Sequence, residues 1–175
     1  MILPGFLISI LTFPGVIVHE FAHQLFCHWT GTRVIRVCYF QLGNPCGYVV
    51  HERPSSTWKH LWIGIGPLFV NTLVGYLIGL LADPLRYGAP GQGPANFVLL
   101  WLAVSIALHS FPSSGDARSI WTGIWRKGTP VTAKLVGAPL VALIYLGAVG
   151  SIFWLDAAYG VGVVLAAQEA RRHFL

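Results

Sequence analysis

The sequence predicts an all-α polytopic membrane protein. Four to five transmembrane helices would form a single domain over residues 1–175, with a small membrane-associated β-hairpin after the first span. Of the 175 residues, 55% are hydrophobic and only 10% are charged, and the mean hydropathy is +0.66. A soluble domain carries about 25% charged residues, which eleven Lys/Arg and six Asp/Glu cannot supply. The composition therefore excludes a disordered chain, a nucleic-acid-binding domain and most soluble enzymes, and makes the lipid bilayer the expected surroundings.

The apolar stretches define the expected spans, since a helix that crosses the hydrocarbon core needs about 20 apolar residues. Four stretches meet or approach this length: residues 2–29, 61–81, 94–111 and 135–155. A further stretch, residues 157–170, is shorter and begins next to Asp156. It either crosses as a short fifth span or lies at the membrane interface.

A β-hairpin is expected between the first two spans, over residues 33–51. Two runs of β-branched and aromatic residues, 34–42 and 48–50, are separated by Gly43-Asn44-Pro45-Cys46-Gly47. Such a Gly- and Pro-containing segment between two strand-forming runs is typical of a hairpin turn.

The basic residues predict the orientation. Eight of the eleven Lys/Arg lie in the loops after the first and third spans: Arg33, Arg36, Arg53, Lys59, Arg118, Arg126, Lys127 and Lys134. The loop after the second span carries only Arg86. The positive-inside rule places the two basic loops in the cytoplasm and the N-terminus outside. Arg171 and Arg172 favour a cytoplasmic tail as well, which would require the fifth crossing.

The first span contains a motif of ionisable residues, His19-Glu20-Phe21-Ala22-His23. Such side chains are costly inside an apolar helix unless they have partners. The pattern is H-E-x-x-H, and residues i and i+4 share a helix face, so both imidazoles can reach one metal ion. Glu20 directly follows His19 and is therefore rotated from it by about 100° around the helix axis. From this position it can take a proton from the attacking water and pass it to a leaving amine. This predicts one Zn²⁺ per chain with Glu20 as the catalytic residue. The alternative, two buried histidines with other partners, leaves Glu20 unexplained.

A catalytic zinc ion usually has a third protein ligand. The third span runs toward the cytoplasm, as the first does, and is followed by Pro112 and Asp116. Asp116 therefore reaches the same membrane face as the motif and is the expected third ligand. Its alternative role is the N-cap of a helix over residues 117–125. His109, a polar residue within a span, is the alternative ligand.

These residues resemble the site-2 proteases, which are intramembrane zinc metalloproteases. The likeness rests on the motif at residues 19–23, on Gly66-Pro67-Leu68-Phe69-Val70-Asn71, which is similar to the family's G-P-x-x-N segment, and on residues 109–116, which are similar to its N-x-x-P…D-G motif. His109 stands in place of the family's Asn, Ala117 in place of its Gly, and the spacing before Asp116 is one residue shorter.

The resemblance implies a minimal family member, without a PDZ or CBS domain, in a prokaryotic plasma membrane. It implies zinc held by His19, His23 and Asp116, and cleavage of membrane-spanning protein or peptide substrates near the cytoplasmic face. It also implies that the hairpin presents an edge strand to an extended substrate, although the hairpin could instead pack against the helix ends.

Three further residues, Asn71, His109 and Pro112, are expected to support the site or contact substrate. For Asn71, a role in packing between helices is favoured over a direct role in catalysis. The alternative function is a non-catalytic zinc-binding membrane protein, either a transporter or a protease-like scaffold. The nearly apolar second and fourth spans speak against a transporter, and the intact Glu20 speaks against a scaffold. A structural subunit without zinc is the remaining class.

Overall fold

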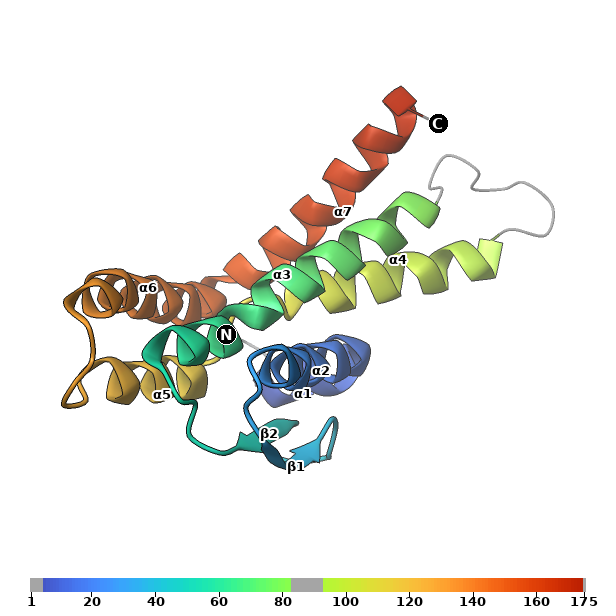
Figure 1. Ribbon diagram of the computed structural model, residues 1–175. Helices are drawn as coiled ribbons and strands as arrows, with labels where there is room; N and C mark the ends of the chain where they lie inside the picture. Colours follow the sequence, from blue (N-terminus) through green and yellow to red (C-terminus); the bar gives the residue numbers. More distant parts are fainter. Residues whose placement is uncertain (1–4, 83–92, 175) are drawn as a thin grey trace.

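The computed structural model describes residues 5–82 and 93–174 and is mostly helical, with one two-stranded antiparallel sheet (Figure 1). The expected helical class and the single hairpin are confirmed. Within the described residues, two helical stretches have the length and hydropathy needed to cross a membrane, Thr57–Leu81 and Val131–Phe153. The other predicted spans fall on helices that are shorter or more polar, so the structure does not establish four to five crossings. Arg86 and its loop lie outside the described residues.

The predicted first span is not one continuous helix. It is divided into α1 (Gly5–Leu11) and α2 (Phe13–Trp29), and residues 2–4 of it lie outside the described residues. Pro14 lies in the first turn of α2 and has no N–H to continue the helical ladder. At the break, Thr12 Oγ1 donates to the Ile8 carbonyl at 2.6 Å. The motif at residues 19–23 is thus carried by a separate helix of 17 residues.

The hairpin follows α2 and consists of β1 (Val34–Cys38) and β2 (Tyr48–His51). Its register pairs Cys38 with Tyr48 and Val37 with Val49, with an irregularity between Val34 and Arg36. Both strands contact α2, so the loop between them is held close to the motif.

The remaining elements are α3 (Thr57–Leu81), α4 (Gly93–Leu108), α5 (Ser114–Ile124), α6 (Val131–Gly150), the short 3₁₀-helix η2 (Ser151–Phe153) and α7 (Leu155–Phe174). In Figure 1, α3, α4 and α7 run side by side, α2 packs against α3 and α4, and α5 packs against α6. Small residues allow these close approaches. A Cβ at Gly15 would lie 2.0 Å from the Ser105 carbonyl oxygen on α4.

The C-terminal helix binds the end of α3. Arg171 donates to the carbonyls of Leu80, Leu81 and Ala82, which satisfies acceptors that a helix C-terminus leaves free. At the opposite end of α3, Thr57 Oγ1 lies 3.3 Å from Thr129 Oγ1. The tail and the loop at Thr129 therefore lie at opposite ends of α3. This arrangement does not agree with the prediction that both lie on one membrane face.

Candidate metal centre

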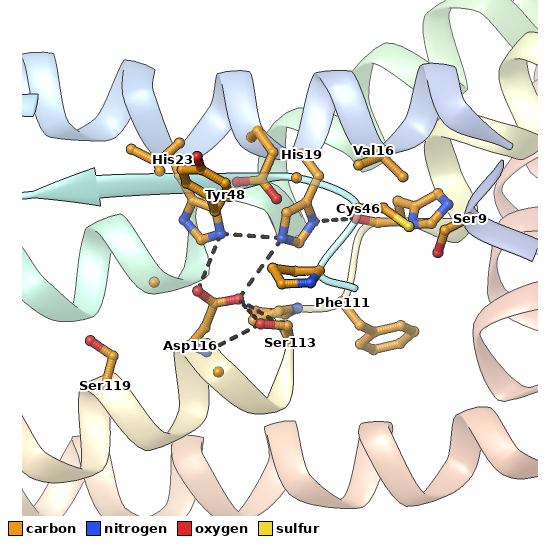
Figure 2. A pocket seen from close by; sticks show the side chains of 18 of the residues that line it. Ser9, Val16, His19, His23, Cys46, Tyr48, Phe111, Ser113, Asp116 and Ser119 are labelled. Atoms are coloured by element: carbon orange, nitrogen blue, oxygen red, sulfur yellow. Dashed lines mark hydrogen bonds and ion pairs between the residues drawn. The ribbon is translucent and has the colours of Figure 1, made fainter. Parts of the chain in front are cut away.

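The two histidines of the motif lie one turn apart on α2 and are both buried, at 8% and 6% exposure. Their Nε2 atoms are 3.2 Å apart. The turn that precedes them is fixed by Gly15, which packs against the backbone of α4. The two imidazoles therefore converge on one point beside α2 (Figure 2).

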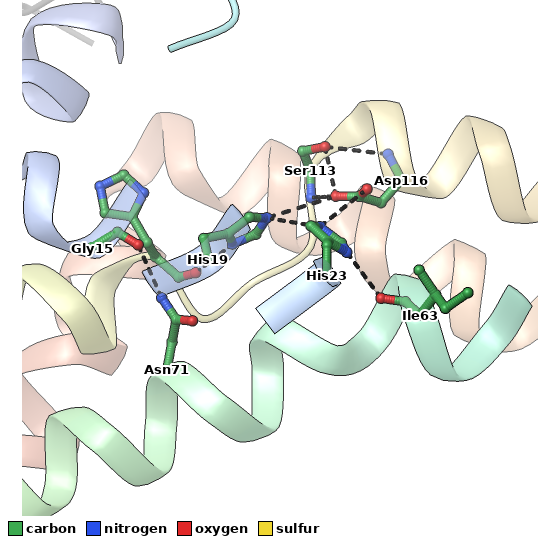
Figure 3. Close-up of polar contacts among 8 residues, drawn as sticks. Gly15, His19, His23, Ile63, Asn71, Ser113 and Asp116 are labelled. Carbon is green, nitrogen blue, oxygen red and sulfur yellow. Dashed lines mark hydrogen bonds and ion pairs between the residues drawn. The ribbon is translucent and has the colours of Figure 1, made fainter. Parts of the chain in front are cut away.

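The other ring nitrogen of each histidine bonds to a backbone carbonyl. His19 Nδ1 donates to the His109 carbonyl at 2.7 Å, and His23 Nδ1 donates to the Ile63 carbonyl at 2.9 Å (Figure 3). A carbonyl only accepts, so these bonds place the proton on Nδ1 and leave the Nε2 lone pair free. This arrangement is typical of metal-binding histidines.

The third group is Asp116, in the first turn of α5. Its Oδ2 accepts hydrogen bonds from the backbone N–H and the hydroxyl of Ser113, both at 2.7 Å. Its Oδ1 lies 3.4 Å from His23 Nε2, and Oδ2 lies 3.9 Å from His19 Nε2.

The alternative prediction, that Asp116 is the N-cap of the helix that follows it, is wrong by three residues. Ser113 is the N-cap, and Asp116 is the third residue of a capping box, in which each side chain bonds to the other's backbone N–H. One carboxylate thus starts α5 and also faces the two histidines.

The three donors fit a zinc ion. They lie within 4.8 Å of one another. Tetrahedral zinc with bonds of about 2.0–2.1 Å requires donors about 3.3 Å apart. The 3.2 Å between the imidazoles and the 3.4 Å from His23 to Asp116 are close to this value, and the 3.9 Å from His19 to Asp116 is longer. Two opposed Nε2 lone pairs at this distance repel each other unless a cation lies between them. Two imidazoles and one carboxylate are also a ligand set found in catalytic zinc sites.

A cavity of about 870 Å³ adjoins this group and is lined by both histidines, Glu20 and Asp116. Glu20 is 9% exposed and packs against the hairpin loop, where a Cβ at Gly47 would lie 2.7 Å from Glu20 Cγ. The carboxylate that the motif assigns to proton transfer therefore lies on the wall of the cavity that is also lined by His19, His23 and Asp116.

The three remaining predicted residues have different environments. Pro112 lines the cavity. The His109 imidazole bonds to Thr12 Oγ1 at 2.8 Å, so its ring lies apart from the three-donor group and only its carbonyl supports His19. Asn71 Nδ2 donates to the Gly15 carbonyl (Figure 3) and to the Ile106 carbonyl, each at 3.1 Å. Asn71 thus joins α3 to α2 and α4, the contact expected of a polar residue between helices.

Sequence reasoning missed three contributors to the site: the Ile63 carbonyl, the His109 carbonyl and Ser113. The two carbonyls belong to the backbone, so no residue type marks them. Ser113 has a recognisable signal, because Ser-x-x-Asp before a helix is a capping-box pattern.

Comparison with family models finds a match that covers residues 12–127 and is described as "Putative zincin peptidase". Comparisons with curated proteins and with solved structures find no significant match. The matched region contains α2, the hairpin, the described part of α3 and α4, and α5, and thus every residue of the three-donor group and Glu20. Because the match covers more than half of the chain, the protein belongs to this family of zincin peptidases.

Proposed function

We propose that the protein is a zinc-dependent intramembrane endopeptidase of the site-2 protease type. The observation that carries the proposal is the convergence of His19, His23 and Asp116 beside a cavity that also contains Glu20. These residues come from two helices that are distant in sequence. The zincin family supports the metallopeptidase part of the proposal.

In this function His19, His23 and Asp116 hold the ion. Zinc supplies Lewis-acid chemistry, because it polarises a carbonyl and makes water more acidic. Glu20 accepts the proton of the attacking water and delivers it to the leaving amine nitrogen. The carbonyls of Ile63 and His109 hold the imidazoles in position through their Nδ1–H groups.

The contact of the site with α3 supports a position for it within the membrane. His23 bonds to Ile63, in the second turn of α3, which lies about 9 Å along the axis from the start of that helix. Since α3 is long and apolar enough to cross a bilayer, the site would lie inside the membrane, near the α3 N-terminus. The basic residues of the adjoining loops make that face the cytoplasmic one, and we propose a prokaryotic plasma membrane.

The substrate would be a membrane-spanning protein or peptide, made extended before cleavage. Tyr48, Val49 and His51 of β2 line the cavity that holds the metal ligands. An extended segment could add to this hairpin through main-chain hydrogen bonds, which would keep its scissile carbonyl accessible.

The test compares the full chain with Glu20→Gln, using a reconstituted single-span peptide as substrate. Glu20→Gln should keep about one zinc ion per chain and lose cleavage by about 10²-fold or more. Glu52→Gln is the matched control, since Glu52 is exposed and pairs with Arg33; it should cleave as the wild type does. Full proteolysis by Glu20→Gln would overturn the mechanism. Zinc binding without cleavage by the wild type would support the non-catalytic alternative.

A further inference from the structure

A second cavity, of about 540 Å³, lies beside the first. Its wall is formed mainly by two segments, residues 53–58 before and at the start of α3 and residues 126–130 before α6. Thr57 and Thr129 connect these segments through their hydroxyls, 3.3 Å apart. The cavity therefore lies where two helices begin that, among the described residues, are long and apolar enough to cross a membrane.

The charge of this cavity is entirely positive. Arg53, Arg126 and Lys127 line it, and no Asp or Glu does. In the described part of the chain, none of the three forms an ion pair with a carboxylate. Three unpaired cations around one cavity favour an anionic ligand, because each of them repels the others until it is neutralised.

The polar groups of the wall suit an anion with several acceptor oxygens. Ser55 contributes a hydroxyl, whereas the Thr129 hydroxyl donates to the Gly123 carbonyl at 3.3 Å and lies 3.3 Å from the Thr57 hydroxyl. The start of α3 adds backbone N–H groups and the positive end of the helix dipole. A phosphate group matches this set of donors, since its oxygens can accept from guanidinium, hydroxyl and amide groups at once.

His60 supplies an independent observation. It is 7% exposed and lines both cavities. Its Nε2 lies 2.8 Å from Ser119 Oγ, whereas its Nδ1 has no hydrogen-bond partner among the residues described. When the Ser119 hydroxyl donates to Nε2, Nδ1 carries a proton that it can donate to a ligand. In this tautomer the wall contains a buried side chain whose Nδ1–H is free to donate.

The surrounding tryptophans give the level of the cavity in the membrane. Trp58 lines it and is 40% exposed, and Trp121 and Trp125, also exposed, lie at the end of α5. Exposed tryptophans gather at the boundary between hydrocarbon and headgroups, where the abundant anions are lipid phosphates.

We propose that this cavity binds the phosphate of an anionic phospholipid headgroup. The proposal rests on the membrane placement given under the proposed function, but not on peptidase activity. Basic pockets between helices at the cytoplasmic face recognise headgroups in this way. The lipid would contact His60, which separates the headgroup from the cavity of the metal centre.

The test measures retention of phosphatidylglycerol, phosphatidylcholine and inorganic phosphate by the purified full chain in detergent, using native mass spectrometry. Arg53→Gln/Arg126→Gln removes two cations from the wall and should weaken phosphatidylglycerol binding by about 30-fold. The control, Arg33→Gln/Arg118→Gln, makes the same charge change outside the cavity and should weaken it by less than about threefold. Zinc content, measured on each variant, reports whether the fold is intact.

Preference for phosphatidylglycerol over phosphatidylcholine, lost in the cavity variant alone, is the expected result. Equal losses in both double variants would overturn the proposal, since they would show general surface attraction. Inorganic phosphate binding that needs Arg53 and Arg126, without any preference between the two lipids, would overturn the lipid assignment. A wild type that cleaves nothing yet shows the lipid preference would contradict the peptidase function and leave this proposal standing.

Discussion

Ser113 and Asp116 bond to each other reciprocally at the start of α5. The Ser113 hydroxyl donates to Asp116 Oδ2 at 2.7 Å, and the Asp116 backbone N–H donates to Ser113 Oγ at 3.2 Å. The carboxylate is thereby fixed by its own helix cap, with Oδ1 directed at His23. The same local motif that begins a helix therefore also positions the proposed third metal ligand.

Replacing Ser113 should weaken metal binding without removing a ligand. Ser113→Ala deletes the hydroxyl bond to Oδ2 but keeps the backbone N–H bond. Partners of this kind contribute about 10- to 100-fold to metal affinity, so we expect a loss of at least about tenfold and a helix destabilised by about 1 kcal/mol. Competition with a zinc chelator measures the affinity. Ser114→Ala, at the adjacent exposed position, should bind zinc as the wild type does, and an equal loss in both variants would contradict the capping role.

The His109 ring should be dispensable for zinc. His109→Ala keeps the backbone carbonyl that bonds to His19 and removes only the ring bonded to Thr12. We expect about one zinc ion per chain and a free energy of unfolding lower by about 1–2 kcal/mol. Thr12→Val removes the hydroxyl that bonds to the His109 ring and should give a similar change in the free energy of unfolding. Loss of zinc from His109→Ala, with zinc retained in Thr12→Val, would show instead that the His109 ring is a ligand.

Enlarging Gly15 should disturb both the fold and the site. A Cβ there would lie 2.0 Å from the Ser105 carbonyl and 2.4 Å from the His109 ring, so α2 would have to move away from α4. Gly15→Ala should lower the free energy of unfolding in mixed detergent micelles by about 3 kcal/mol or more and should also reduce zinc affinity. Gly162→Ala, where a Cβ meets nothing within 4 Å, should change stability by less than about 1 kcal/mol. Equal behaviour of the two variants would mean that the close contact is absent.

The sequence was most informative where chemistry depends on residue type and helical spacing. The i, i+4 spacing of His19 and His23 predicts their shared direction, and the turn after the third apolar stretch predicts that Asp116 approaches them. The structure brings these three residues together. The helical class and the hairpin were also predictable, since hydropathy and turn residues mark them locally.

Features that depend on backbone groups or on distant contacts were not predictable. The carbonyls of Ile63 and His109 have no signature in the sequence, although they orient both imidazoles. The break at Thr12 lies within a continuous apolar run, in which Pro14 is the local signal that a new helix begins. Arg171 was interpreted as a sign of membrane orientation, yet it binds the carbonyl end of α3, a contact across about ninety residues of chain.

The central claim is that His19, His23 and Asp116 form one zinc site, and metal analysis of the purified full chain tests it most directly. The wild type should carry about one zinc ion per chain and His23→Ala should carry almost none. His28→Ala, an exposed histidine five residues along the same helix, should match the wild type. A wild type without zinc, or a His23→Ala protein that keeps its full complement, would contradict the account.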